Sequence, residues 1–515
     1  MDVTAAQLNP SHIAFEERRE DKTTYFSLPV VLFLSFLMLA VIALSYFFLS
    51  HQSLRLDESQ SLWQSSHSPM GVLTVISHDV HVPLYGLILH FWMTLFGTSV
   101  ASARALSLIF FLLCIPAIYL LAATVYNKPI GLFAALLLAT SPFLNWYGSE
   151  TRMYTLLALL TILNQYFFIR IAKFKKNPQG DAATLWWMFT GISLLGIYTH
   201  YFFWLVLFAE AVYFLACRKD FPQNSFRNFI IAAVILVFAL APWLWFVKSQ
   251  HTSANSVPDL LKPSSIDLFN TLSQFIFGFQ TDHLNTIILS LWPITVLLAF
   301  LNIRKKNGLT KESGFFLLAA FIPIIIAFLV SIAVRPVFLS RYLILTTPAL
   351  YIFLAWFLSS FPAKAAMTIK SLLIVVMLFT LFKQTTGAST PVKENYEEAS
   401  GYVSAHATER DAIILSAPFT LYPFEYYYKG PTAIYTAPLW NPYQVGPIPP
   451  FSQDGLIKEI DDLKTTHDRV WVLLSYDQGY QKDVYNYFET HYARVDFQQF
   501  SAGLNLYAYQ LKYDR

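Results

Sequence analysis

Two adjacent carboxylates, Asp57 and Glu58, stand where the first long apolar segment of the chain gives way to polar sequence. A carboxylate at the end of a membrane span, in contact with water, can accept a proton from a hydroxyl group or hold a cation. A structural role is also open, because acids at span ends often cap a helix or stay solvated. The pair is a candidate acid-base centre of a membrane protein.

Further charged residues occur at the ends of later apolar segments, among them Glu150, Arg152 and Arg341. The planar guanidinium of an arginine can pair with two oxygens of one phosphate group. Arg152 and Arg341 are therefore candidate ligands of a lipid phosphate. The alternative is a snorkelling arginine, or a plain ion pair between Glu150 and Arg152.

Histidines add a third kind of group near these positions. His78 and His81 follow the first apolar segment, three residues apart, and His200 falls at the end of another. Together with Asp57 and Glu58 they could bind a divalent cation, for which Glu58, His78 and His81 are the candidate ligands. No recognised ligand spacing supports such a site, and histidines that hold substrate or loops by hydrogen bonds are the alternative.

The composition indicates a membrane protein. Of the 515 residues, 55% are hydrophobic and only 13% are charged, which is too apolar for a soluble globular chain. The net charge of +3 arises from short basic clusters between apolar segments, so we expect no nucleic-acid partner. With only 2 cysteines, a disulfide framework or a cysteine metal site is not expected.

Apolar segments of about 20 residues, long enough to cross a bilayer, recur along the chain and predict about eleven spans. The expected spans are 26–50, 101–125, 129–147, 152–172, 184–200, 201–217, 228–247, 284–303, 314–334, 341–361 and 367–386. Lysines and arginines fall on alternate connections, which predicts a cytoplasmic segment 1–25 and a multi-pass domain 26–386 in the cytoplasmic membrane. The first loop, 51–100, and the C-terminal part, 387–515, are then extracytoplasmic.

Both of these outer parts carry folding signals. Apolar residues recur at helical spacing from Pro83 to Gly97 and predict a helix of about four turns in the membrane interface. This helix would cover the site beside Asp57. Alternating strand-like and helix-like segments after residue 387 predict an α/β domain. We expect strands at 411–417, 432–437, 469–476 and 504–511 and helices at 394–406, 454–467 and 480–491.

Several short motifs, in this order, resemble those of the GT-C membrane glycosyltransferases. They are Asp57-Glu58, His81-Val82-Pro83-Leu84-Tyr85, Leu95-Phe96-Gly97, Arg104 in Ala101-Ser102-Ala103-Arg104-Ala105, Ser141-Pro142-Phe143, Glu150-Thr151-Arg152-Met153-Tyr154 and Ser340-Arg341-Tyr342-Leu343. The resemblance spans roughly the first 350 residues. It is greatest to bacterial relatives of the dolichyl-phosphate-mannose protein mannosyltransferases and weaker to the lipid A aminoarabinose transferases.

This resemblance implies a catalytic base at Asp57, with Glu58 as a supporting acid, and a polyprenyl-phosphate sugar as donor. Arg152 and Arg341 are the implied ligands of the donor phosphate. The remaining candidate residues for substrate binding are Glu150, Tyr154, His81, Tyr342 and His200.

We therefore expect a glycosyltransferase that moves a sugar from a polyprenyl-phosphate carrier to a lipid, glycan or protein acceptor at the outer membrane face. A carboxylate nucleophile would retain the configuration of the sugar carbon, whereas a single carboxylate base would invert it, and we expect inversion with Asp57 as the base. The alternative is a transporter or flippase of lipid-linked sugars. That function favours ionisable residues at mid-bilayer depth and related halves, whereas the candidate residues gather at span ends.

Overall fold

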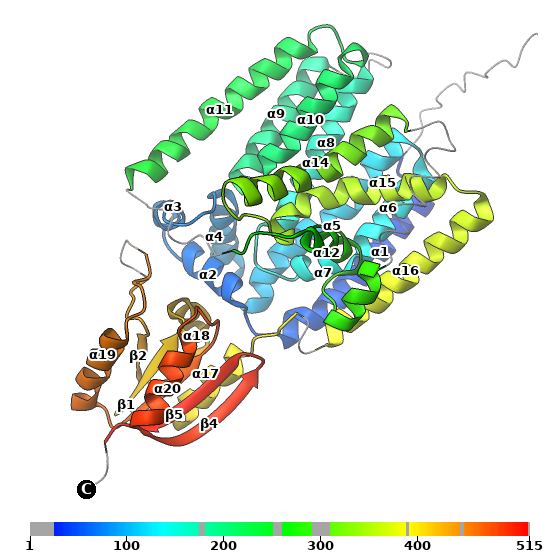
Figure 1. The fold of residues 1–515 in the computed structure, drawn as a ribbon. Helices are drawn as coiled ribbons and strands as arrows, with labels where there is room; N and C mark the ends of the chain where they lie inside the picture. The colour runs from blue at the N-terminus through cyan, green and yellow to red at the C-terminus, as the bar shows by residue number, and fades with distance from the viewer. Residues whose placement is uncertain are drawn as a thin grey trace, which may run out of the picture.

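The computed structural model describes residues 25–174, 181–250, 260–290, 309–387, 391–442 and 447–512. A helical membrane domain is followed by a smaller α/β domain that lies against one end of it (Figure 1). This arrangement confirms the predicted fold class, a polytopic helical protein with a C-terminal α/β domain.

Within the described residues, 8 helices are long and apolar enough to cross a membrane. They are α1 (Leu28–His51, of which Leu28–Tyr46 is the candidate span), α5 (Val100–Val125), α8 (Tyr154–Phe174), α9 (Ala182–Thr199), α11 (Ser225–Ser249), α14 (Lys311–Ala333), η2 with α15 (Ser340–Thr346 and Thr347–Ser359) and α16 (Ala363–Thr386). Two shorter helices, α10 (Phe203–Ala216) and α12 (Ser265–Phe277), belong to the same domain.

A ninth span is broken in the middle. The expected continuous span 129–147 is instead α6 (Lys128–Thr140) followed by α7 (Pro142–Gly148), with an angle of 61° between them. Proline cannot donate a backbone hydrogen bond and disfavours helical geometry in the residue before it. Ser141 is accordingly extended, and its hydroxyl accepts a hydrogen bond from the Leu144 amide to start α7.

The expected number of spans, about eleven, is therefore larger than the 8 or 9 that the described residues contain. The segment 201–217 forms α10, which has 14 residues and is short for a span. Most of the expected span 284–303 lies outside the described residues.

The loop after α1 folds into three helices, α2 (Leu56–Ser65), α3 (Pro69–Ser77) and α4 (Leu84–Phe96). The predicted helix between Pro83 and Gly97 is α4, and Gly97 ends it with a φ of 82°, which residues other than glycine rarely adopt. α4 packs against α2, α3 and α5. Consequently α2, the helix that carries Asp57 and Glu58, is held from one side by α4.

The C-terminal domain contains a five-stranded mixed sheet with strand order β2-β1-β3-β5-β4. The strands are β1 (Asp411–Ser416), β2 (Ala433–Thr436), β3 (Arg469–Leu474), β4 (Ala493–Ser501) and β5 (Leu504–Gln510). β1 pairs in parallel with β2 and β3, and β5 pairs antiparallel with β3 and β4. Apolar residues of α19 (Gln453–Thr466) and α20 (Gln481–His491) pack on one face, and those of α17 (Tyr396–His406) and α18 (Leu421–Tyr427) on the other.

Four strands and three helices of this domain match the expected segments, whereas β4 and α18 are additional. β4 is an edge strand with mostly exposed or half-buried residues, so its sequence lacks a clear apolar alternation. α18 has only 7 residues, too few for a helical period to be recognised.

The two domains meet at the start of α2. The Leu54 amide donates to the Tyr427 hydroxyl at 2.8 Å, and the Leu56 amide donates to the Glu394 carboxylate at 3.3 Å. The Ser53 hydroxyl donates to the Glu394 carbonyl at 2.6 Å. The C-terminal domain therefore holds the backbone immediately before Asp57, and α18 packs along α2.

Candidate active site

α2 begins at the polar cluster because its first turn is closed by its own side chains. The Glu58 carboxylate accepts the Arg55 amide at 3.0 Å, as a glutamate does at the third position of a capping box. Asp57 and Glu58 both lie in this first turn, where the positive end of the helix dipole favours carboxylates. Adjacent positions on a helix point in different directions, so the two acids meet different partners.

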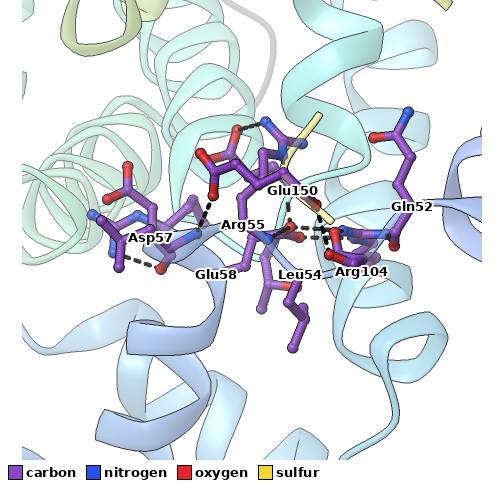
Figure 2. Close-up of polar contacts among 12 residues, drawn as sticks. Gln52, Leu54, Arg55, Asp57, Glu58, Arg104 and Glu150 are labelled. Carbon is purple, nitrogen blue, oxygen red and sulfur yellow. Dashed lines mark hydrogen bonds and ion pairs between the residues drawn. The ribbon is translucent and has the colours of Figure 1, made fainter. Parts of the chain in front are cut away.

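Glu58 points into the protein, and both oxygens of its carboxylate accept hydrogen bonds. Its carboxylate receives two hydrogen bonds from Arg104, at 2.7 and 2.8 Å, and one from the Thr151 amide at 3.0 Å. Burial alone would raise its pKa, but Arg104 and then Arg55 outweigh burial and lower the pKa of Glu58 to about 2. Glu58 is thus a permanent anion that ties α2 to α5 and to the loop before α8 (Figure 2).

Asp57 lies on the other side of the same turn, away from Arg104 (Figure 2). Its carboxylate forms an ion pair with Arg341 of η2 at 3.0 Å. The two side chains are 27% and 33% exposed, whereas those of Glu58 and Arg104 are 0% and 1% exposed. Burial raises the pKa of Asp57, but the charges of Arg341 and Arg152 overcome it and keep that pKa below its usual value. Asp57 is therefore an accessible, ionised carboxylate.

Arg152 approaches the same turn from the loop between α7 and α8. Its guanidinium donates to the Asp57 carbonyl at 3.3 Å and to the Ser61 hydroxyl at 3.1 Å, and lies 2.7 Å from Nε2 of His81. Burial lowers the pKa of His81 to about 4. The negative charge of Asp79 opposes this shift, and the positive charge of Arg152 adds to it. His81 is therefore neutral at neutral pH and can accept a hydrogen bond from Arg152 through Nε2.

Glu150 forms an ion pair with Arg55 at 3.0 Å. The alternative prediction, an ion pair between Glu150 and Arg152, is therefore not what the structure contains. The Arg55 guanidinium also stacks over the Trp146 ring, 3.8 Å from its centroid. Burial raises the pKa of Glu150, and the nearby Arg55 charge only partly offsets that effect. Glu150 is buried and is bound to Arg55, so in this geometry it holds the Arg55 guanidinium in place.

Three other predicted residues lie around the Asp57–Arg341 pair. Tyr154 is fully buried among the charges of Arg341, Arg152 and Asp57. The Tyr342 ring lies 5.6 Å from the Arg341 guanidinium and 5.2 Å from the His200 ring. Burial lowers the pKa of His200 to about 3, and the positive charges of the cluster act in the same direction.

Several polar atoms of this cluster are buried without a hydrogen-bond partner among the described residues. They are Nε of Arg152, Nε of Arg341 and the hydroxyl of Tyr154. Buried donors are normally satisfied, so unsatisfied ones next to each other are typical of a site that receives a polar ligand. These three donors would suit an anion.

The residues proposed for a cation do not come together. Glu58 faces Arg104, His81 faces Arg152, and His78 ends α3. Among the described residues, no group of three or more histidine, cysteine, aspartate or glutamate side chains is arranged to hold a metal ion.

The sequence patterns predicted no site role for Arg55, Arg104, Trp146 and Glu394, although Arg104 occurs in one of the motifs. Arg104 also donates to the carbonyls of Gln52 and Ser53, at 2.8 and 2.9 Å, and so fixes the turn that precedes α2. A buried arginine inside the apolar helix α5 was the one available signal, since a charge there requires a partner.

Comparisons with known proteins agree with this architecture. Residues 80–246 match the family model described as dolichyl-phosphate-mannose-protein mannosyltransferase. A comparison with curated proteins gives no significant match.

The fold is similar to that of ArnT from Cupriavidus metallidurans, at 13% sequence identity. The crystal structure of ArnT bound to undecaprenyl phosphate superposes with a TM-score of 0.62 and covers 94% of this chain and 98% of that one. The apo structure gives a TM-score of 0.60, covering 93% and 97%. The predicted resemblance is confirmed: the chain is a polytopic membrane protein with an ArnT-like GT-C fold, and its residues 80–246 match the dolichyl-phosphate-mannose-protein mannosyltransferase family model.

Proposed function

We propose that this protein transfers a sugar from a polyprenyl-phosphate donor to an acceptor hydroxyl, with Asp57 as the general base. The observation that carries the proposal is the ion pair between Asp57 and Arg341, in which an accessible carboxylate and an accessible guanidinium lie 3.0 Å apart. In such a transfer the base and the phosphate ligand act on the two sides of one carbon atom, so both must belong to the same site. The ArnT structure bound to undecaprenyl phosphate supports a lipid of this class.

The donor phosphate would bind where the unsatisfied donors converge. Nε of Arg152, Nε of Arg341 and the Tyr154 hydroxyl are buried without partners among the described residues and can donate to phosphate oxygens. The terminal nitrogens of Arg152 are already held by Ser61 and His81, so this arginine is oriented before the lipid arrives.

Donor binding would also activate the base. Arg341 lowers the pKa of Asp57 in the unliganded geometry. When Arg341 pairs with the phosphate instead, Asp57 loses this positive neighbour and gains a negative one, and both changes raise its basicity. Asp57 would thus become an effective proton acceptor only with a donor in place.

In the transfer step, the acceptor hydroxyl gives its proton to the Asp57 carboxylate while its oxygen bonds to the anomeric carbon. The bond from that carbon to the phosphate oxygen breaks, and the electron pair leaves with the polyprenyl phosphate. Arg152 and Arg341 stabilise the charge of the leaving group, which needs no protonation. Glu58 and Glu150 are bound to Arg104 and Arg55, so a single carboxylate is left to act and we expect inversion.

The membrane side follows from the charge pattern of the sequence, with the C-terminal domain and the site extracytoplasmic and the N-terminus cytoplasmic. The acceptor is a lipid, glycan or protein hydroxyl presented there. Because the C-terminal domain contacts α2 directly, it would both hold the site and border the acceptor.

A buried acid, Glu210, is the feature that a transporter or flippase, the alternative function, would use. Glu210 is fully buried in α10, away from the span ends. With the Asn164 amide oriented to donate, its nitrogen lies 2.8 and 3.0 Å from the two Glu210 oxygens, while its oxygen accepts from Ser193 at 2.8 Å. These contacts between three helices account for the buried acid as helix-to-helix bonding.

The test is a transfer assay with purified protein in nanodiscs and polyprenyl-phosphate sugars as donors. Mass spectrometry would follow the release of polyprenyl phosphate and the mass gained by the acceptor, and NMR would give the anomeric configuration. Co-purified lipid, identified in the same way, would select the donors to try. Movement of intact donor across a vesicle membrane, without cleavage, would instead establish the transporter.

A further inference from the structure

A separate cavity lies at the opposite end of the membrane domain from Asp57. It has a volume of about 180 Å³ and lies between the end of α8, the start of α9 and the start of α11. α8 begins near Arg152 and ends at Phe174, in the wall of this cavity. The proposed transfer site and the cavity therefore lie at opposite ends of α8.

The polar wall of the cavity is the N-terminus of α11. The first turn of a helix presents free backbone N–H groups and the positive end of the helix dipole, which favour anions. Asn224 precedes this helix without capping it through its side chain, and Arg227 lies in the first turn. Asn224, Arg227 and Asn228 thus line the same space, and their side chains end in amide and guanidinium groups.

An independent observation indicates that this space receives a ligand. Ser225 lines the cavity, its side chain is 1% exposed, and its hydroxyl has no hydrogen-bond partner among the described residues. A buried hydroxyl without a partner destabilises the fold, and in native proteins such groups usually bind water, an ion or a ligand. Here the hydroxyl lies beside the amides of a helix start.

The opposite wall is apolar. Phe174 and Ile171 of α8 and Leu185 and Trp186 of α9 line it. Tryptophan is enriched where lipid headgroups meet acyl chains, and basic pockets between membrane helices bind anionic headgroups. The cavity therefore combines donors for a phosphate with an apolar surface for the chain attached to it.

We propose that this cavity binds a phosphate group, carried by an anionic phospholipid headgroup or free in solution, at the membrane face opposite the transfer site. Ser225, Arg227 and the α11 N-terminus bind the phosphate oxygens, and Trp186 and Phe174 contact the adjoining apolar part. The site does not depend on the proposed glycosyl transfer.

Binding would be measured on the full-length protein in detergent by native mass spectrometry and thermal unfolding. The probes are phosphatidylglycerol, inorganic phosphate, and diacylglycerol, which has acyl chains but no phosphate. Arg227→Gln should weaken phosphatidylglycerol binding about tenfold, as expected for one charge-assisted hydrogen bond. Lys364→Gln is the matched control, because Lys364 is an exposed base near the start of α16 and does not line the cavity.

The outcomes separate the sources of the phosphate. Binding of phosphatidylglycerol but not of inorganic phosphate assigns the site to lipid, and protection by inorganic phosphate alone assigns it to the free anion. Equal binding of diacylglycerol, or an equal loss in Arg227→Gln and Lys364→Gln, would overturn the proposal.

Ser225→Ala gives a second test that does not depend on charge. Removing an unsatisfied buried hydroxyl should stabilise the ligand-free protein, while binding of the phosphate probe becomes weaker. Stabilisation with unchanged binding would show that the hydroxyl is only a packing defect and would also overturn the proposal.

Discussion

The Arg341 guanidinium lies 3.0 Å from the Asp57 carboxylate, although 284 residues separate them in the chain. The ion pair joins η2, at the start of a membrane span, to the first turn of α2. In the proposed reaction Arg341 is the phosphate ligand and Asp57 is the base, so the binding partner of each affects the other. Arg341 restrains Asp57 until a donor phosphate competes for the guanidinium.

Asp57→Asn should reduce sugar transfer by about two to four powers of ten, the usual contribution of a general base, because the amide keeps the shape and loses the basicity. Donor binding should persist, since the amide does not compete with phosphate for Arg341. Turnover and lipid binding of the purified variant check this, with the exposed Glu397→Gln as control. Turnover near that of the wild type would remove Asp57 from the reaction, and loss of donor binding would make it a substrate ligand.

Arg341→Lys should weaken donor binding by about 1–3 kcal/mol, the range for charge-assisted hydrogen bonds, although the charge is kept. A lysine ammonium is a point charge and cannot present the planar pair of donors. The binding constant for a polyprenyl phosphate is the measurement, and Arg335→Lys, at an exposed arginine nearby, is the control. If both variants bind the lipid equally, Arg341 does not contact the phosphate.

Glu58→Gln should act on stability, because it leaves the buried Arg104 guanidinium without its anion. Breaking one partner of a buried pair costs about 3–5 kcal/mol. Thermal unfolding should show this loss for Glu58→Gln and little change for the exposed control Glu409→Gln. A stable Glu58→Gln variant that is inactive would instead assign Glu58 a direct role in the reaction.

Acid should destabilise the native protein through protonation of Glu58. Its pKa is lowered from 4.5 to about 2 in the fold, so the native state holds fewer protons than the unfolded state between these values. The stabilisation by Glu58 is present above about pH 4.5 and declines as the pH falls toward 2. The acid limb of the stability profile should therefore be shallower in Glu58→Gln than in the wild type.

The contact between the two domains, where Glu394 lies, should have the opposite pH dependence. Burial raises the pKa of Glu394 to about 7, although the Arg55 charge lowers it in part. The native carboxyl then holds a proton that the unfolded chain has lost, so docking should weaken as the pH rises from about 4.5 to 7 and level off above that. Hydrogen exchange at the Leu54 and Leu56 amides would report it, and Glu394→Gln should remove the dependence. An unchanged pH profile in that variant would exclude Glu394 as the titrating group.

Glu210→Gln distinguishes the two classes of function. A glutamine can keep a hydrogen bond to Asn164, so a transferase should retain its turnover and its fold. A transporter that uses this buried acid for coupling should lose transport. The paired readouts are sugar transfer in nanodiscs and donor movement in vesicles.

Local sequence patterns predicted the elements that are built from local interactions. The long apolar segments identified most membrane helices, and Pro83 and Gly97 marked the limits of α4, because their backbone preferences act within a few residues. Strands β1 and β3 were expected from strand-like segments, and the structure buries their residues almost entirely. The edge strand β4 was missed because its pairing with β5, and not its own apolar pattern, defines it.

For the site, the sequence by itself determined which residue types are present and that they lie at the ends of apolar segments. It led to Asp57, Arg152 and Arg341 as one group, and the structure brings these three together. Only the tertiary structure decided which acid is accessible: Glu58 is buried against Arg104 and Glu150 against Arg55, while Asp57 stays open. Such pairings join helices far apart in sequence, and their free energies depend on burial and on distances of a few ångströms. A charge pattern along the chain contains neither quantity.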